Sequence, residues 1–114
     1  MAGTGGTPPF TFSWHTESAT PANPPQDEQL IVLPAGEVDL ATAPLLQRAL
    51  LIAVDRHPRV CCDLSKVTFF SAAGVTALLV VHNRAIQTGS RLTARRPHGI
   101  TERVLHLAGL EHMQ

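Results

Sequence analysis

The sequence contains no tyrosine, one tryptophan and four phenylalanines among its 114 residues. With so few aromatic rings, a folded core must be filled mainly by aliphatic side chains, and 44% of the residues are hydrophobic. No apolar run approaches the length of about 20 residues that crosses a membrane as a helix. The N-terminus lacks the basic start and apolar centre of a signal peptide. We therefore expect a cytoplasmic protein with a flexible segment over residues 1–9 and a single domain over residues 10–114.

The chain also lacks an excess of charge of either sign, because nine basic residues balance nine acidic ones. This balance argues against a protein that binds nucleic acid directly. The charge is unevenly distributed, since seven acids and three bases before residue 64 give −4, whereas two acids and six bases after it give +4. Most of the basic half consists of Arg91, Arg95, Arg96 and Arg103. These arginines predict either a solvated face or a docking patch for an acidic partner.

Signals for a metal, a cofactor or a catalytic centre are missing as well. The only cysteines, Cys61 and Cys62, are neighbours, and on a strand they point to opposite faces, so they do not converge on a metal. They fit a reducing compartment. The histidines show no ligand spacing, and no phosphate loop or Ser/His/Asp arrangement is visible. We predict no metal, no cofactor and no enzymatic activity.

Hydrophobic periodicity and turn residues predict the secondary structure. Strands are expected over residues 10–15, 30–33, 59–64 and 91–94, and helices over 42–56, 71–88 and 97–107. Thr42 and Ser71 are suitable N-caps, Pro44 fits a first turn, and Gly89 is a suitable C-cap. The order β-β-α-β-α-β-α predicts an α/β fold, in which helices pack against a mixed β-sheet that contains parallel βαβ units.

The second predicted helix has two distinct stripes. We assign the core face to Val75, Leu78, Leu79, His82 and Ile86. The opposite stripe consists of Ala73, Thr76, Ala77, Val80, Arg84 and Gln87. Its first two turns are small and apolar although we expect them to be exposed. Alanine is a good helix former, which is one explanation, and a surface for docking a partner is the other.

Three segments resemble the signature of a known family. The longest is Asp63-Leu-Ser-Lys-Val-Thr-Phe-Phe-Ser-Ala-Ala-Gly-Val-Thr-Ala-Leu-Leu79, and it is preceded by Gly36-Glu-Val-Asp39. The third is Arg103-Val-Leu105 followed by Leu107-Ala-Gly-Leu110. In this order and spacing, the segments resemble the STAS domain, the fold of bacterial anti-sigma factor antagonists. That family usually continues beyond the equivalent of Leu110, so the resemblance is to a short version.

The resemblance implies a regulatory mechanism, and this chain departs from its motif at two adjacent positions. In the family, the second residue of an Asp-Ser pair at a helix start is the phosphorylated serine. When the motif is aligned on Phe69 and Gly74, the family aspartate falls on Ser71 and the phosphoserine falls on Ala72. Alanine has no hydroxyl group, so the usual phosphorylation switch is missing at residue 72.

The resemblance also implies a partner. In the family, the unphosphorylated antagonist binds an anti-sigma factor with a serine kinase fold and thereby releases a sigma factor. We expect the partner to contact Asp39, Ser71, Ala72, Ala73, Thr76 and Val80. Other roles remain open: Asp39 as a turn or capping residue, and Ser71 as an N-cap or a relocated phosphorylation site. The domain as a whole could instead be a scaffold or sensor module, or a cytosolic subunit of a transporter complex.

Overall fold

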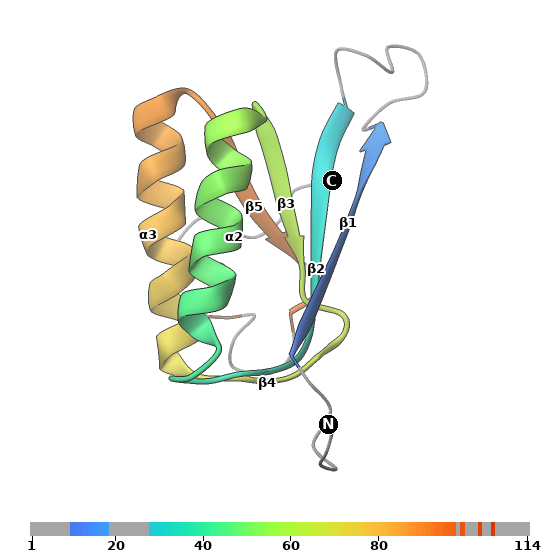
Figure 1. Cartoon of the computed structure of the whole chain (residues 1–114), viewed down its shortest axis with the longest axis vertical. Coiled ribbons are helices and arrows are strands. Elements are labelled where there is room, and N and C mark those ends of the chain that lie inside the picture. The colour runs from blue at the N-terminus through green and yellow to red at the C-terminus, as the bar shows by residue number, and fades with distance from the viewer. Residues whose placement is uncertain (1–9, 19–27, 98, 100–102, 104–105, 107–114) are drawn as a thin grey trace, which may run out of the picture.

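The computed structural model describes residues 10–18, 28–97, 99, 103 and 106. Four strands form a sheet in the order β1 (Thr11–Ser18), β2 (Glu28–Val38), β3 (Arg59–Asp63) and β5 (Arg91–Arg95). The β1–β2 pair is antiparallel, whereas β2–β3 and β3–β5 are parallel. The helices α2 (Ala43–Arg56) and α3 (Ala72–Thr88) lie side by side over one face of this sheet (Figure 1). The predicted mixed sheet with parallel βαβ units is confirmed.

The core between the helices and the sheet is aliphatic, as the shortage of aromatic residues predicts. Leu46 and Leu50 of α2 and Leu78 and Val81 of α3 have no exposed surface. They pack against the side chains that the strands turn toward the helices: Val32, Val60, Cys62, Leu92 and Ala94. Both cysteines are buried, and neither forms a disulfide.

β2 is longer than the predicted strand over residues 30–33, and it continues through Pro34 and Gly36 to Val38. A proline is tolerated here because β2 changes partner at this point. Its pairing with β3 ends at Val32, and its pairing with the short strand β4 (Val67–Phe70) begins at Gly36. On this side of β2, Pro34 falls between the two ladders, and on the other side it lies opposite Phe12 of β1. Gly36 has a φ of 112° and lies at the bulge where the second ladder starts.

β4 is absent from the predicted elements, where residues 65–70 form a linker. The strand has only four residues, and two of them, Thr68 and Phe69, are exposed. This segment is too short to show a convincing alternation. It becomes a strand because the end of β2 offers it a parallel hydrogen-bonding partner.

The buried face of α3 differs from the predicted one. Leu79 and Ile86 were expected in the core but are 36% and 64% exposed, whereas Ala77 was expected outside and is 2% exposed. The residues that α3 buries are largely small: Gly74, Ala77, Leu78, Val81 and Ala85. Small side chains allow α3 to approach α2 and the sheet closely. The size of a side chain therefore does not by itself predict whether it lies in the core.

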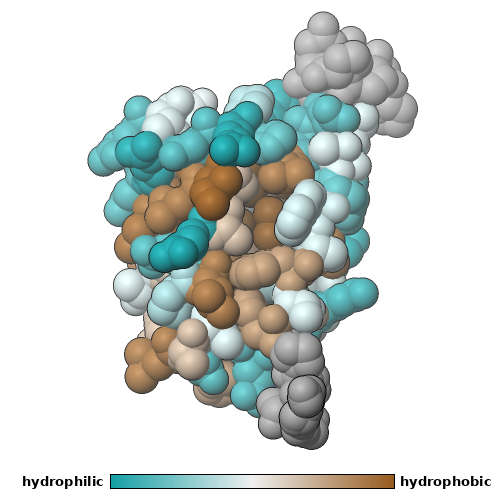
Figure 2. Space-filling view, in the orientation of Figure 1, coloured by the Kyte–Doolittle hydropathy of each residue, from teal (hydrophilic) through white to brown (hydrophobic). Residues whose placement is uncertain are grey.

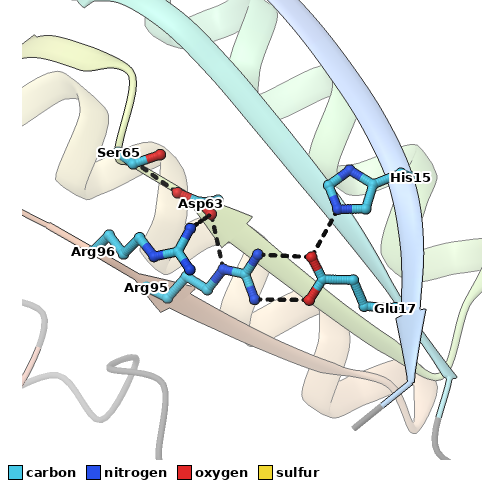
Figure 3. Close-up of polar contacts among 6 residues, drawn as sticks. All are labelled: His15, Glu17, Asp63, Ser65, Arg95 and Arg96. Carbon is cyan, nitrogen blue, oxygen red and sulfur yellow. Dashed lines mark hydrogen bonds and ion pairs between the residues drawn. The ribbon is translucent and has the colours of Figure 1, made fainter.

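The two arginines at the end of β5, Arg95 and Arg96, contact a carboxylate of the fold. Asp63, with no exposed surface, accepts hydrogen bonds from Arg95 Nε at 2.8 Å and from Arg96 Nη1 at 2.9 Å. Burial alone would raise the pKa of Asp63, but hydrogen bonds from Ser65 and Arg95 outweigh it and lower the pKa. Asp63 therefore stays ionised and ties the end of β3 to β5 (Figure 3).

The same arginine reaches across the sheet to β1. Both terminal nitrogens of Arg95 donate to the Glu17 carboxylate at 3.0 Å, and His15 Nε2 lies 2.8 Å from the same carboxylate. Hydrogen bonds from Arg95 and His15 lower the pKa of Glu17 to about 2. Figure 3 shows these groups spread over the strands from β1 to β5.

Two predicted segments, the flexible stretch over residues 1–9 and most of the helix over 97–107, lie outside the described residues.

Candidate functional site

Asp39 and Ser71 come together because the strands before them are paired. In the parallel β2–β4 ladder, Val38 lies opposite Phe70, so the next residue of each chain segment emerges at the same end of the sheet. The Ser71 N–H donates to the Val38 carbonyl oxygen at 2.8 Å. The two motifs thus meet where α2 and α3 begin (Figure 1). Sites in open α/β sheets tend to lie at the carboxyl ends of the strands, and the strand that causes this meeting, β4, is absent from the predicted elements.

Asp39 has a structural role in the turn that starts α2. Its Oδ1 accepts hydrogen bonds from the Ala41 N–H at 3.0 Å and the Thr42 N–H at 3.1 Å. Thr42 occupies the N-cap position but makes no side-chain capping bond, because its Oγ1 accepts instead from the Asp39 N–H at 2.9 Å and donates to the Glu37 carbonyl oxygen at 2.7 Å. The hydrogen bond from the Thr42 backbone is the main reason that the pKa of Asp39 is lowered. Asp39 is therefore a negative charge held in a fixed turn.

Ser71 precedes α3 as expected, but its hydroxyl makes no capping hydrogen bond. The first-turn N–H that it would cap belongs to Gly74, and this group donates instead to the Ser71 carbonyl oxygen at 3.0 Å. The Ser71 Oγ is buried and has no hydrogen-bond partner in the described part of the chain. Ala72, the next residue, is exposed. The hydroxyl group is thus hidden, and the methyl group at the position of the family phosphoserine faces outward.

Two hollows meet at these residues and form one surface, which we call the α2–α3 groove. The first hollow is lined by Asp39, Leu40, Ala41, Ser71, Ala72 and Ala73. The second is lined by Leu40, Ala43, Pro44, Gln47, Arg48, Leu51, Ala73 and Thr76. Leu40 and Ala73 belong to both hollows, so the groove runs from the helix starts upward between the helices. In Figure 2, hydrophobic residues gather over this side of the molecule.

The groove is mostly apolar, with one lining charge of each sign. Asp39 lies at the helix starts and Arg48 lies further along α2. Beyond them, Arg84 of α3 forms an ion pair with Asp55 of α2, with an Nε–Oδ1 distance of 3.0 Å, and this pair bridges the two helices. Leu40 is 84% exposed. An exposed leucine beside an apolar groove is typical of a surface that binds another protein.

The predicted site residues are brought together with one exception. Asp39, Ser71, Ala72, Ala73 and Thr76 all line the groove, whereas Val80, 41% exposed, lies outside both hollows. The sequence prediction did not include the largest apolar contributor, Leu40. Its position directly after the Gly-Glu-Val-Asp motif was the available signal, because an aliphatic residue in a loop has no core to fill.

The lining of the groove is mainly small and aliphatic. No histidine or cysteine lines it, and the Ser71 hydroxyl has no base beside it. Among the residues that the structure describes, no group of three or more His, Cys, Asp and Glu side chains is placed to hold a metal ion. Within the same part of the chain, neither helix is long and apolar enough to cross a membrane.

Comparisons with solved structures show two kinds of relative. An anti-sigma factor antagonist from Mycobacterium paratuberculosis is 29% identical, with 91% of this chain and 83% of that chain covered and a TM-score of 0.61. The phosphorylated form of the Bacillus cell fate determinant SpoIIAA is 15% identical, with 86% of this chain and 85% of that chain covered and a TM-score of 0.61. The murine anion transporter Solute Carrier 26 family member A9 is 14% identical, with 90% of this chain and 19% of that chain covered and a TM-score of 0.64. The last two likenesses concern the fold alone.

A family model agrees with these likenesses. The model described as "Mlab, STAS domain" matches residues 24–114. A search of curated proteins found no match. Because the family model covers most of the chain, and the sheet and helices have the arrangement of the solved relatives, the protein belongs to the STAS-domain family.

Proposed function

We propose that this protein is a cytoplasmic anti-sigma factor antagonist that binds its partner through the α2–α3 groove. The observation that carries the proposal is the mostly apolar groove at the start of α3, where Leu40, Ala72 and Thr76 are exposed. The 29% identity to an anti-sigma factor antagonist supports the choice of partner class. The role is binding, and the chain itself catalyses no reaction.

The regulation of the complex differs from that of the family. A phosphate at residue 72 would place about −1.5 to −2 charges beside the groove, next to the charge of Asp39. Repulsion and desolvation would then weaken the complex. Ala72 cannot accept a phosphate, so the antagonist stays competent to bind and is controlled by its amount or by competing partners.

The test uses two arginine substitutions on the same helix. Thr76→Arg places a long charged side chain in the groove, whereas Gln87→Arg places the same side chain on an exposed residue near the far end of α3. We expect Thr76→Arg to weaken binding to the anti-sigma factor by about 1–4 kcal/mol in titration calorimetry. Gln87→Arg should bind as wild type does. Equal affinity of the Thr76→Arg variant and wild type would reject the groove as the binding site.

A second function is favoured by the likeness to the anion transporter, which matches 90% of this chain. In this case the domain would be a subunit of a transporter complex, bound through the same groove. Purification of the tagged wild-type and Thr76→Arg proteins from native cells distinguishes the two. Loss of a kinase-fold protein from the Thr76→Arg sample supports the antagonist, and loss of an ATPase or membrane protein supports the transporter subunit.

A further inference from the structure

The two edges of the sheet differ in their protection against pairing with another chain. β5, at one edge, has five residues with an arginine at each end. β1, at the other edge, has eight residues, none of them lysine or proline, and its register with β2 runs without a bulge. Short length, charge, proline and bulges are the features that keep edge strands from joining other strands. Among the described residues, β1 is therefore the unprotected edge.

Exposed apolar side chains lie on the helix side of the sheet, and one of them, Trp14, belongs to this edge. Trp14 lies opposite Val32, which belongs to the core under the helices, so Trp14 projects to the same side. Trp14 is 68% exposed. Leu45 and Ile52, one heptad apart on the outer side of α2, are 52% and 49% exposed. A partner that pairs with β1 therefore also covers Trp14.

We propose that this partner is a second copy of the chain, whose β1 pairs antiparallel with β1 about a two-fold axis. An antiparallel pair of identical strands is self-complementary, so one edge satisfies the other. In a register centred on Trp14, the two tryptophans meet, and Glu17 lies opposite Thr11 of the second copy, so no two carboxylates face each other. The chain has no net charge, and two copies therefore do not repel each other.

The size of the contact sets its expected strength. Eight residues of strand extend for about 27 Å, and the shortest dimension of the molecule is 24 Å. A contact surface of this length and depth buries on the order of 600 Å² on each partner, which is at the lower end for specific complexes. The dimer should accordingly be reversible, with a Kd in roughly the micromolar range. It leaves the α2–α3 groove open, because the groove lies between the helices and away from β1 (Figure 1).

Sedimentation equilibrium over a concentration series tests the proposal. The wild-type mass should rise from 12.2 kDa toward twice that value. Trp14 is the only tryptophan, so its emission should move to shorter wavelength and become less accessible to acrylamide as the mass rises. Trp14→Glu removes the central apolar contact and opposes two carboxylates, and it should remain monomeric. Ile86→Glu changes a residue that is 64% exposed on α3 and should still dimerise.

Two results would overturn the proposal. One is a wild-type mass that stays at 12.2 kDa at the highest attainable concentration. The other is a dimer that forms equally well in the Trp14→Glu variant, because β1 would then not be the interface. Neither result bears on the anti-sigma factor, which is bound through a different surface.

Discussion

Ala72 stands at the position that the family motif gives to the phosphorylated serine, and in the proposed function it removes that switch. Its side chain is exposed at the start of α3, where a kinase could reach it. The neighbouring hydroxyl of Ser71 is buried and therefore poorly placed to accept a phosphate instead. A single methyl group thus replaces the acceptor while the surrounding fold is kept.

We predict that the wild-type protein stays unphosphorylated when it is incubated with its anti-sigma factor kinase and ATP, whereas Ala72→Ser gains one phosphate. Serine is well tolerated at a helix start, so the substitution should leave the fold unchanged. Intact-protein mass spectrometry measures both reactions. Efficient phosphorylation of the wild-type chain would contradict the idea of a permanently active antagonist and would point to another hydroxyl as the switch.

Arg95 is a second single residue with a predicted effect, in this case on the free energy of unfolding. Its guanidinium contacts the fully buried carboxylate of Asp63 and the carboxylate of Glu17. We predict that Arg95→Gln lowers the free energy of unfolding by about 3 kcal/mol, the lower end for a broken buried ion pair, because Arg96 still binds Asp63. Urea denaturation measures this loss. Arg91→Gln, at the exposed start of β5, is the matched control and should cost less than about 0.5 kcal/mol.

At the scale of elements, the start of α3 is positioned by its contact with β2 and β4. Gly74 lies in the first turn of the helix, directly against side chains of both strands. A Cβ added there would lie 2.8 Å from Phe70 Cζ and 2.8 Å from Val38 Cγ1. The missing side chain lets the helix approach the end of the sheet, and this approach closes the space behind the α2–α3 groove.

Gly74→Ala is therefore expected to destabilise the protein, although alanine is the better helix former. Overpacking should cost about 1–3 kcal/mol, which is reduced by the gain in helix propensity of about 1 kcal/mol. Thr76→Ala, on the exposed side of the same helix, should be neutral or slightly stabilising. Urea denaturation of both variants measures the difference. A Gly74→Ala protein more stable than wild type would show that α3 does not approach the strands so closely.

At the scale of the whole molecule, one ion pair connects the two edges of the sheet. Glu17 belongs to β1 and Arg95 to β5, and β2 and β3 lie between them in the sheet order. The network on this face therefore holds together segments that are 78 positions apart in the sequence. The opposite face is held by the aliphatic core and carries the groove.

The pH dependence of stability should report this connection. The pKa of Glu17 is about 2 in the folded protein and 4.5 ordinarily. Its contribution is therefore complete above about pH 4.5 and is lost as the pH falls toward 2. We predict that the stability difference between wild type and Glu17→Gln, measured by urea denaturation, is largest near pH 6 and shrinks toward pH 2. Glu28→Gln, at the exposed start of β2, serves as the control. A difference that does not change with pH would show that Glu17 is not held by Arg95.

The sequence by itself determined most elements and their order. The helices α2 and α3 and the strands β3 and β5 begin and end within about one residue of their predicted bounds, because caps, turns and hydrophobic periodicity act between neighbours in the chain. The Gly-Glu-Val-Asp and Asp-Leu-Ser segments also indicated the family and five of the groove residues: Asp39, Ser71, Ala72, Ala73 and Thr76. These signals are local, so they can be recognised in the sequence without knowledge of the fold.

Only the tertiary structure decided the rest. β4 exists because β2 provides a partner, and Leu79 and Ile86 are exposed because α3 turns its smaller residues toward α2 and the sheet. Whether Arg95 is a docking residue or a structural one depends on Asp63, 32 positions away. Each of these outcomes depends on which distant segment lies next to a residue, and neighbouring letters of the sequence do not carry that information.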